Sequence, residues 1–159
     1  MPNFPCPCGS ERYAECCQPL HLGQNKAETA EQLMRSRYSA FAKQEIDYIV
    51  KTTALGQQQA LDVKAIADWS KANQWLKLEI VQAKEKLGKN HAQVEFKAHY
   101  ADANDQVQKV QIHHEVSHFV KHDGAWYFLD PTTDQQITMK QPCICGSGKK
   151  FKQCCAEFL

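Results

Sequence analysis

All the cysteines of this chain fall into two short clusters, one near each end. The chain has eight cysteines, and both clusters follow one template, Cys-x-Cys-Gly-Ser, a short bridge, then Cys-Cys. The members are Cys6, Cys8, Cys16 and Cys17 in the first cluster and Cys143, Cys145, Cys154 and Cys155 in the second. Four thiols are the ligand set of a structural tetrahedral zinc site. We therefore predict two zinc sites, with iron as the alternative metal because thiolate sites accept both ions.

The spacing within each cluster leaves alternatives open. Zinc fingers commonly place two or more residues between the first two ligands, so one thiol of each pair could lie outside the ligand set. Disulfides are the other alternative, although a bridge between adjacent cysteines strains the backbone. Gly9 and Gly146 are expected to take positive φ in a tight turn, after which the bridge forms about one helical turn.

Composition places the chain among ordinary globular proteins. It has 159 residues, 43% of them hydrophobic and 23% charged, with a net charge of +1. That charge argues against a broad nucleic-acid footprint. We expect no secretory signal, because a basic segment followed by an apolar run is missing at the start, and no membrane-spanning helix. A cytoplasmic location is then expected, where thiols stay reduced and paired cysteines favour metal.

The middle of the chain begins with a helical pattern. Thr29, with Gln32 three residues on, matches a helix-capping box. The residues that recur at helical spacing are Met34, Tyr38, Phe41, Glu45 and Tyr48. A second helix is expected to begin near Asp62, with Ile66 and Trp69 facing inward.

From Trp75 the hydrophobic period changes to two. Leu76, Leu78 and Ile80 alternate with polar residues, which predicts a strand. Further strands are expected over 94–100, 106–121 and 126–129, joined by turns at 88–90, 102–105 and 123–124. Two helices before a four-stranded antiparallel meander form an α+β layer arrangement.

The terminal clusters resemble a known family motif. The segment Cys143-Ile-Cys145-Gly-Ser-Gly-Lys-Lys-Phe-Lys-Gln-Cys154-Cys155 is similar to the SEC-C motif, the zinc tail of the ATPase that drives bacterial preprotein translocation. That tail usually ends on a His ligand, where this chain has Cys155. The N-terminal copy has a shorter bridge and carries Glu11-Arg12 in place of Gly-Lys-Lys, so its surface is expected to be less basic.

The middle segment also carries a resemblance. Leu33-Met-Arg-Ser-Arg-Tyr-Ser-Ala-Phe41 and the Gly-x-Trp-Tyr-x-x-Asp run over 124–130 are similar to the YchJ-like family of bacterial proteins. This likeness implies an NTF2-like cone, with helices packed on a curved antiparallel sheet, and no known reaction. The expected divisions are a metal motif over 1–20, a linker over 21–28, the NTF2-like domain over 29–134, a linker over 135–140 and a metal motif over 141–159.

NTF2-like cones often enclose a pocket, so polar and aromatic residues of the middle segment are candidate pocket residues. Arg35 and Arg37 lie two apart on a helix and do not share a face, and an inward-facing one would need an acidic partner such as Glu115 or Asp130. His113 and Glu115 share one strand face and could do acid–base chemistry. The remaining candidates are aromatic, namely Tyr38, Trp75, Trp126 and Tyr127. Each of these residues has a purely structural alternative, as an ion pair, a surface ladder or a core aromatic.

The sequence favours a metal-binding adapter over an enzyme. Lys149, Lys150 and Lys152 form a basic run that either contacts a partner or offsets the thiolate charge. The SEC-C resemblance implies a protein partner, either a secretion chaperone or a ribosome-associated factor. Nucleic-acid binding would be weak with so few lysines. The alternative function is a small-ligand binder or enzyme with a pocket near Arg37, Glu115 and Asp130.

Overall fold

The computed structural model describes residues 5–10, 12–107 and 109–159. The first residues of the predicted N-terminal motif and Glu11 of its bridge lie outside this set. The helices are α1 (Gln18–His21), α2 (Ala30–Lys43), α3 (Ile46–Lys51) and α4 (Val63–Ala72). The strands are β1 (Asn73–Lys84), β2 (His91–Asp102), β3 (Gln111–His122) and β4 (Ala125–Leu129). Short 3-10 turns lie at Tyr13–Glu15, Leu55–Ala60, Phe151–Gln153 and Ala156–Phe158.

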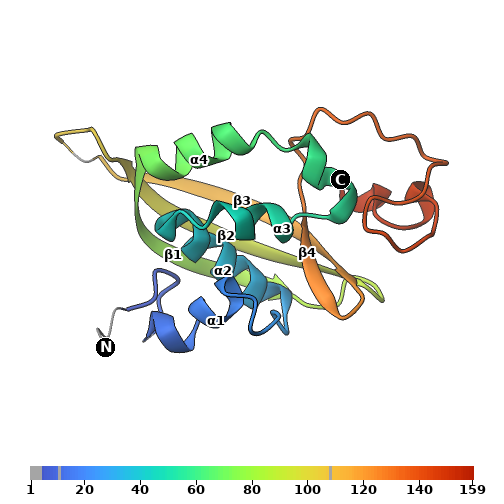
Figure 1. Cartoon of the computed structure of the whole chain (residues 1–159), viewed down its shortest axis with the longest axis horizontal. Coiled ribbons are helices and arrows are strands. Elements are labelled where there is room, and N and C mark those ends of the chain that lie inside the picture. Colours follow the sequence, from blue (N-terminus) through green and yellow to red (C-terminus); the bar gives the residue numbers. More distant parts are fainter. Residues whose placement is uncertain (1–4, 11, 108) are drawn as a thin grey trace.

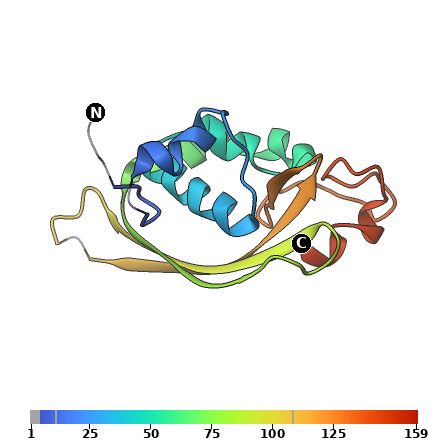
Figure 2. The same ribbon diagram turned by 90° about the horizontal axis from the view of Figure 1, so that it is seen from below.

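The strands form one antiparallel sheet in the order β1-β2-β3-β4. The sheet curves, and the helices cover its concave face (Figure 2). The two-layer α+β arrangement predicted from the sequence is confirmed. Among the described residues, no helix combines the length and the apolar character needed to cross a bilayer.

Local sequence explains the sharp turns of the meander. β3 and β4 are joined through Asp123 and Gly124, whose φ values of 49° and 77° are both positive. Two consecutive positive φ values define the type I′ hairpin turn, which Asp-Gly favours. The predicted turn is therefore confirmed.

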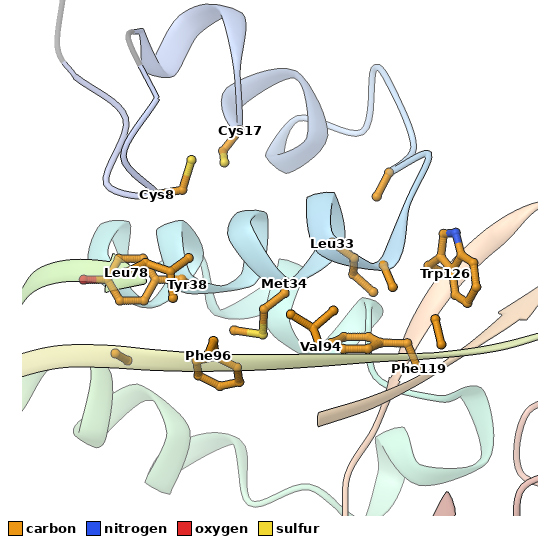
Figure 3. Packing of buried hydrophobic residues seen from close by; sticks show 14 of the residues in the cluster. Cys8, Cys17, Leu33, Met34, Tyr38, Leu78, Val94, Phe96, Phe119 and Trp126 are labelled. Atoms are coloured by element: carbon orange, nitrogen blue, oxygen red, sulfur yellow. The ribbon is translucent and has the colours of Figure 1, made fainter. Parts of the chain in front are cut away.

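Helix α2 is the central element of the core. Thr29 caps it by accepting a hydrogen bond from the backbone of Gln32, at 3.0 Å. Met34 and Tyr38 pack toward the sheet residues Val94 and Phe96 (Figure 3). The opposite side of the helix is also covered, by the N-terminal cysteine motif, so α2 lies between the motif and the sheet.

Two predicted element boundaries are wrong, and the alternation of one confirmed strand is interrupted. The first predicted helix is two helices, because Gln44 takes a left-handed conformation (φ 59°) and ends α2 before α3 begins. Leu76 points out of the core and is 45% exposed, because a register shift between Trp75 and Lys77 interrupts the alternation. β3 begins at Gln111, five residues later than the predicted start at 106.

Candidate metal centres and cavity

The N-terminal motif brings its four sulfurs together. The Sγ atoms of Cys8 and Cys16 lie 3.6 Å apart, and those of Cys16 and Cys17 lie 3.7 Å apart. All four Sγ atoms lie within 4.8 Å of one another. The tight turn depends on Gly9, whose φ is 103° as expected for a residue without Cβ.

The C-terminal motif repeats this geometry. Its Cys145–Cys154 and Cys154–Cys155 sulfur distances are 3.6 and 3.8 Å, and Gly146 has a φ of 88°. In both motifs a single 3-10 turn lies before the Cys-Cys pair, which confirms the predicted helical bridge.

These distances fit a tetrahedral thiolate site. Zn–S bonds of about 2.3 Å place the sulfurs of a tetrahedron about 3.8 Å apart. A disulfide would need an S–S distance of about 2.05 Å, and all eight cysteines are free thiols. In each motif the four sulfurs converge on one point, so all four can ligate. The chain therefore has two four-cysteine clusters suited to metal ions.

The pKa values of the thiols in each cluster also favour binding of a metal ion. Burial raises the pKa of the Cys16 thiol, and likewise that of Cys154, to about 11. The pKa of Cys6 is lowered instead, because Cys17 and Cys8 donate hydrogen bonds to its thiolate. Without an ion, the crowded sulfurs cannot all ionise together. A divalent ion would remove this repulsion and take the place of the protons.

The N-terminal cluster is anchored on helix α2. Cys6 Sγ lies 3.3 Å from the hydroxyl of Ser39, and Arg35 donates to the carbonyl of Cys8 at 3.0 Å. Cys8 and Cys17 belong to the same buried cluster as the core residues of the sheet (Figure 3). The motif is thus part of the main core.

α1 and the segment after it add to this anchor. His21 bonds to the hydroxyl of Tyr13 at 2.7 Å and to the carbonyl of Ser36 at 2.8 Å. α1 runs across the predicted boundary at residue 20, and Ala27 inside the predicted linker is buried.

The C-terminal cluster is anchored at the other end of the sheet. Gly56 donates to the carbonyl of Ile144 at 2.7 Å, and Ile144 packs with Val120 and Leu129. Gln135, in the predicted linker over 135–140, donates to the carbonyl of Gly56 at 2.7 Å. The two motifs lie apart: the N-terminal one covers the side of α2 away from the sheet, and the C-terminal one lies at one end of the molecule (Figures 1 and 2).

One residue at the C-terminal cluster was missed by sequence analysis. His91, the first residue of β2, places Nε2 3.2 Å from Cys155 Sγ and stacks on Phe158. Burial lowers the pKa of His91, so its imidazole is neutral and can donate to the thiolate. It lies 64 residues from Cys155 in sequence, so no local pattern could reveal the contact.

The three candidate partner-contact lysines lie at the surface of the C-terminal motif. Lys149, Lys150 and Lys152 are exposed, and none of them forms an ion pair with any described residue. The N-terminal motif differs, because its Arg12 pairs with Glu15 at 3.3 Å. Gln153 stands at the position that matches Glu15 before the Cys-Cys pair.

A cavity lies between the helices and the concave face of the sheet. Its volume is about 340 Å³. Six candidate pocket residues line it, namely Arg37, Tyr38, Trp75, His113, Glu115 and Asp130. His113 Nε2 lies 3.3 Å from Glu115 Oε1, and the hydroxyl of Ser117 donates to the other carboxylate oxygen.

Three candidates lie elsewhere. Arg35 faces the N-terminal motif and pairs with Glu31 at 3.0 Å. Trp126 donates its indole N–H to the carbonyl of Glu28 at 3.3 Å. Tyr127 packs against the buried cluster of the C-terminal motif. The alternation along β4 explains Tyr127, because its neighbour Phe128 is the residue of this strand that lines the cavity. Trp126 shares the face of Phe128 and packs in the same core cluster, outside the cavity lining.

The expected ion pair of Arg37 is not formed. Arg37 Nη1 donates instead to the carbonyl of Ile49 at 2.9 Å and to the hydroxyl of Thr52 at 2.7 Å. Within the described part of the chain no carboxylate lies within 4.0 Å of its nitrogens. The acceptors for Arg37 therefore come from the end of α3, where the sequence analysis expected Asp130 or Glu115.

Helices over a curved antiparallel sheet, with a four-cysteine cluster docked at each end, define an NTF2-like protein with metal-binding motifs. Residues 29–131 match the family model of the YchJ middle NTF2-like domain, and residues 139–157 match that of the SEC-C motif. The chain belongs to the YchJ-like family, and the resemblance inferred from the sequence is confirmed.

Relatives match over nearly the whole chain. A UPF0225 protein of Actinobacillus succinogenes is 47% identical over 97% of each chain. One from Haemophilus influenzae is 50% identical over 97% of this chain and 92% of its own. The crystal structure of a SEC-C motif containing protein from Psychrobacter arcticus aligns with a TM-score of 0.87 at 47% identity, covering 97% of this chain and 96% of that one. A solution structure of another, from Rhodopseudomonas palustris, aligns with a TM-score of 0.72 at 36% identity, covering 80% and 96%.

Proposed function

We propose that this protein is a cytoplasmic adapter that uses its zinc-loaded C-terminal motif to contact an acidic surface of a protein partner. The observation that carries the proposal is the group of three exposed lysines on that motif, Lys149, Lys150 and Lys152. Four thiolates around a divalent ion make a negative centre, and these lysines add positive charge to the same motif.

Rigid docking supports a role in recognition. Cys143, Ile144 and Phe151 are buried in one cluster with Val120 and Leu129 of the sheet. The lysines are therefore presented from a fixed platform, which lowers the entropy cost of binding a partner. Opposite charges would add to the rate of association.

A difference between the two motifs supports placing the contact on the C-terminal one. The N-terminal motif is part of the central core, and its Arg12 is neutralised by Glu15. The C-terminal motif lies at the end of the molecule with its lysines free of ion pairs among the described residues (Figure 1). By likeness to the SEC-C motif, the partner belongs to protein export or to the ribosome.

A charge-reversal pull-down tests the proposal. The variant Lys149→Glu/Lys150→Glu/Lys152→Glu should lose its bound partner, because the charge attraction is inverted. The matched control is Lys71→Glu/Lys77→Glu/Lys109→Glu, three exposed lysines outside the motif. It carries the same net charge and should retain the partner.

Metal content and circular dichroism must be unchanged in both variants. Identical partner sets for the wild type and the motif variant would contradict the proposal. Retention of nucleic acid instead of protein, lost steeply with added salt, would also contradict it.

A further inference from the structure

The cavity beneath α2 and α4 has an aromatic end and a polar end. Trp69 and Trp75 form the aromatic end, with Trp69 45% exposed at its mouth. Arg37, Glu115 and Asp130 form the polar end. Its volume, about 340 Å³, falls within the roughly 300–1,000 Å³ range of small-molecule sites.

Arg37 is a buried cation with unused donors. Its side chain is 6% exposed and its guanidinium lies 4.5 Å from the ring centre of Phe128. All its hydrogen bonds to described residues come from Nη1. Nε and Nη2 have no acceptor in the described chain. Neither nitrogen is among the fully buried atoms without a partner, so both keep some accessible surface.

Arg37 remains charged at neutral pH. Burial lowers its pKa to about 10, and the nearby Asp130, Tyr48 and Glu115 oppose that shift. The guanidinium therefore has two donor nitrogens, Nε and Nη2, that a ligand acceptor can bind in place of water. Because Arg37 lines the cavity, a ligand in the cavity can supply this acceptor.

The two carboxyl groups of the cavity limit which ligand charge it can accept. Glu115 is held by His113 and Ser117, and Asp130 by the backbone and hydroxyl of Thr132 at 2.7 and 2.6 Å. Glu115 and Asp130 place two carboxyl groups at the polar end, beside the one guanidinium of Arg37. An anionic head would meet repulsion from the two carboxyl groups, and a cationic head would offer no acceptor to Arg37.

We propose that the cavity binds a small aromatic molecule with an uncharged head of the carboxamide type. Its carbonyl accepts from Arg37, its N–H donates to Glu115 or Asp130, and its ring lies against Trp69 and Trp75. This site is separate from the metal motifs, so the proposal stands independently of the adapter function.

Three probes that share a phenylethyl group test the head group. They are 3-phenylpropionamide, 3-phenylpropionate and 2-phenylethylamine, added to the metal-loaded full chain. The chain has three tryptophans, and their indole N–H signals can be followed by NMR. The amide should shift the Trp69 and Trp75 signals saturably and leave Trp126 unmoved. It should bind roughly tenfold more tightly than either charged probe, the loss expected for one unsatisfied polar contact.

Variants separate the cavity from the surface. Ala98→Leu fills the cavity from β2 and should abolish binding without changing any charge. Arg37→Gln should weaken amide binding roughly tenfold or more. Val116→Leu, on the exposed face of β3, is the matched control and should bind as the wild type does.

Ala98→Leu keeps the test decisive if Arg37→Gln fails to fold. The proposal is overturned if no probe saturates at millimolar concentration, or if the propionate or the amine binds more tightly than the amide. Equal binding by Ala98→Leu and the wild type would also overturn it.

Discussion

At the scale of single residues, the metal clusters depend on contacts from outside their own motifs. Ser39 of α2 reaches Cys6, and His91 of β2 reaches Cys155. Groups that hydrogen-bond a ligand orient it and tune its affinity for metal. The clustered cysteines were readable from sequence because their spacing is local. Ser39 and His91 were not, because only folding brings them to the sulfurs.

We predict that His91→Phe weakens metal retention at the C-terminal cluster by about 10–100-fold, the usual effect of losing a hydrogen bond to a ligand. Phenylalanine keeps the stacking on Phe158 and removes the donor to Cys155. Competition with a colorimetric chelator measures this loss. Metal release should show two phases, and the more labile phase should come from the C-terminal cluster.

His118→Phe is the control for this prediction. His118 lies beside Phe158, at 5.8 Å between ring centroids, and makes no bond to a described sulfur. It should release metal as the wild type does. Unchanged release from His91→Phe would show that the hydrogen bond to Cys155 contributes nothing.

At the scale of elements, sequence patterns located the helices and strands but missed their interruptions. The capping residue Thr29 and the Asp123–Gly124 turn act through neighbouring residues, so they could be predicted. The register shift at Leu76 depends on pairing with β2. Gln44 adopts the left-handed conformation although it is not a glycine, the residue type that usually marks this conformation in a sequence. Tertiary contacts decide both, so local sequence carries no signal for them.

Docking of the C-terminal motif depends on a close backbone approach at Gly56. A Cβ at this position would lie 2.8 Å from Ile144 Cα. We predict that Gly56→Ala lowers the free energy of unfolding by roughly 1–3 kcal/mol, the usual cost of overpacking. Urea denaturation of the metal-loaded protein measures this loss.

Gly88→Ala provides the comparison, because a Cβ there has no described atom within 4 Å. Its free energy of unfolding should change by less than about 0.5 kcal/mol. If the two variants were equally stable, the close contact between Gly56 and Ile144 would not hold the motif.

At the scale of the whole molecule, two cysteine motifs at opposite ends of the chain are built into one NTF2-like domain. The sequence predicted both motifs and the central α+β domain, and these are confirmed. It did not show that α2 lies between the N-terminal motif and the sheet, because the burial of the polar residues Ser36 and Ser39 depends on tertiary contacts. The sequence also did not show which face of β3 points inward. In the structure Ser117 and Phe119 are buried, so the face that also carries Glu115 is the inner one.

Metal analysis of the purified full chain, combined with thiol counting, tests the central claim most directly. We predict two metal ions per chain in protein purified without added metal, and eight reduced thiols after the metal is removed under denaturing conditions. Each ion would be held by four thiolates, so the metal-loaded native protein should react slowly with thiol reagents. Fewer than two ions per chain, or the loss of free thiols to disulfides, would contradict the account.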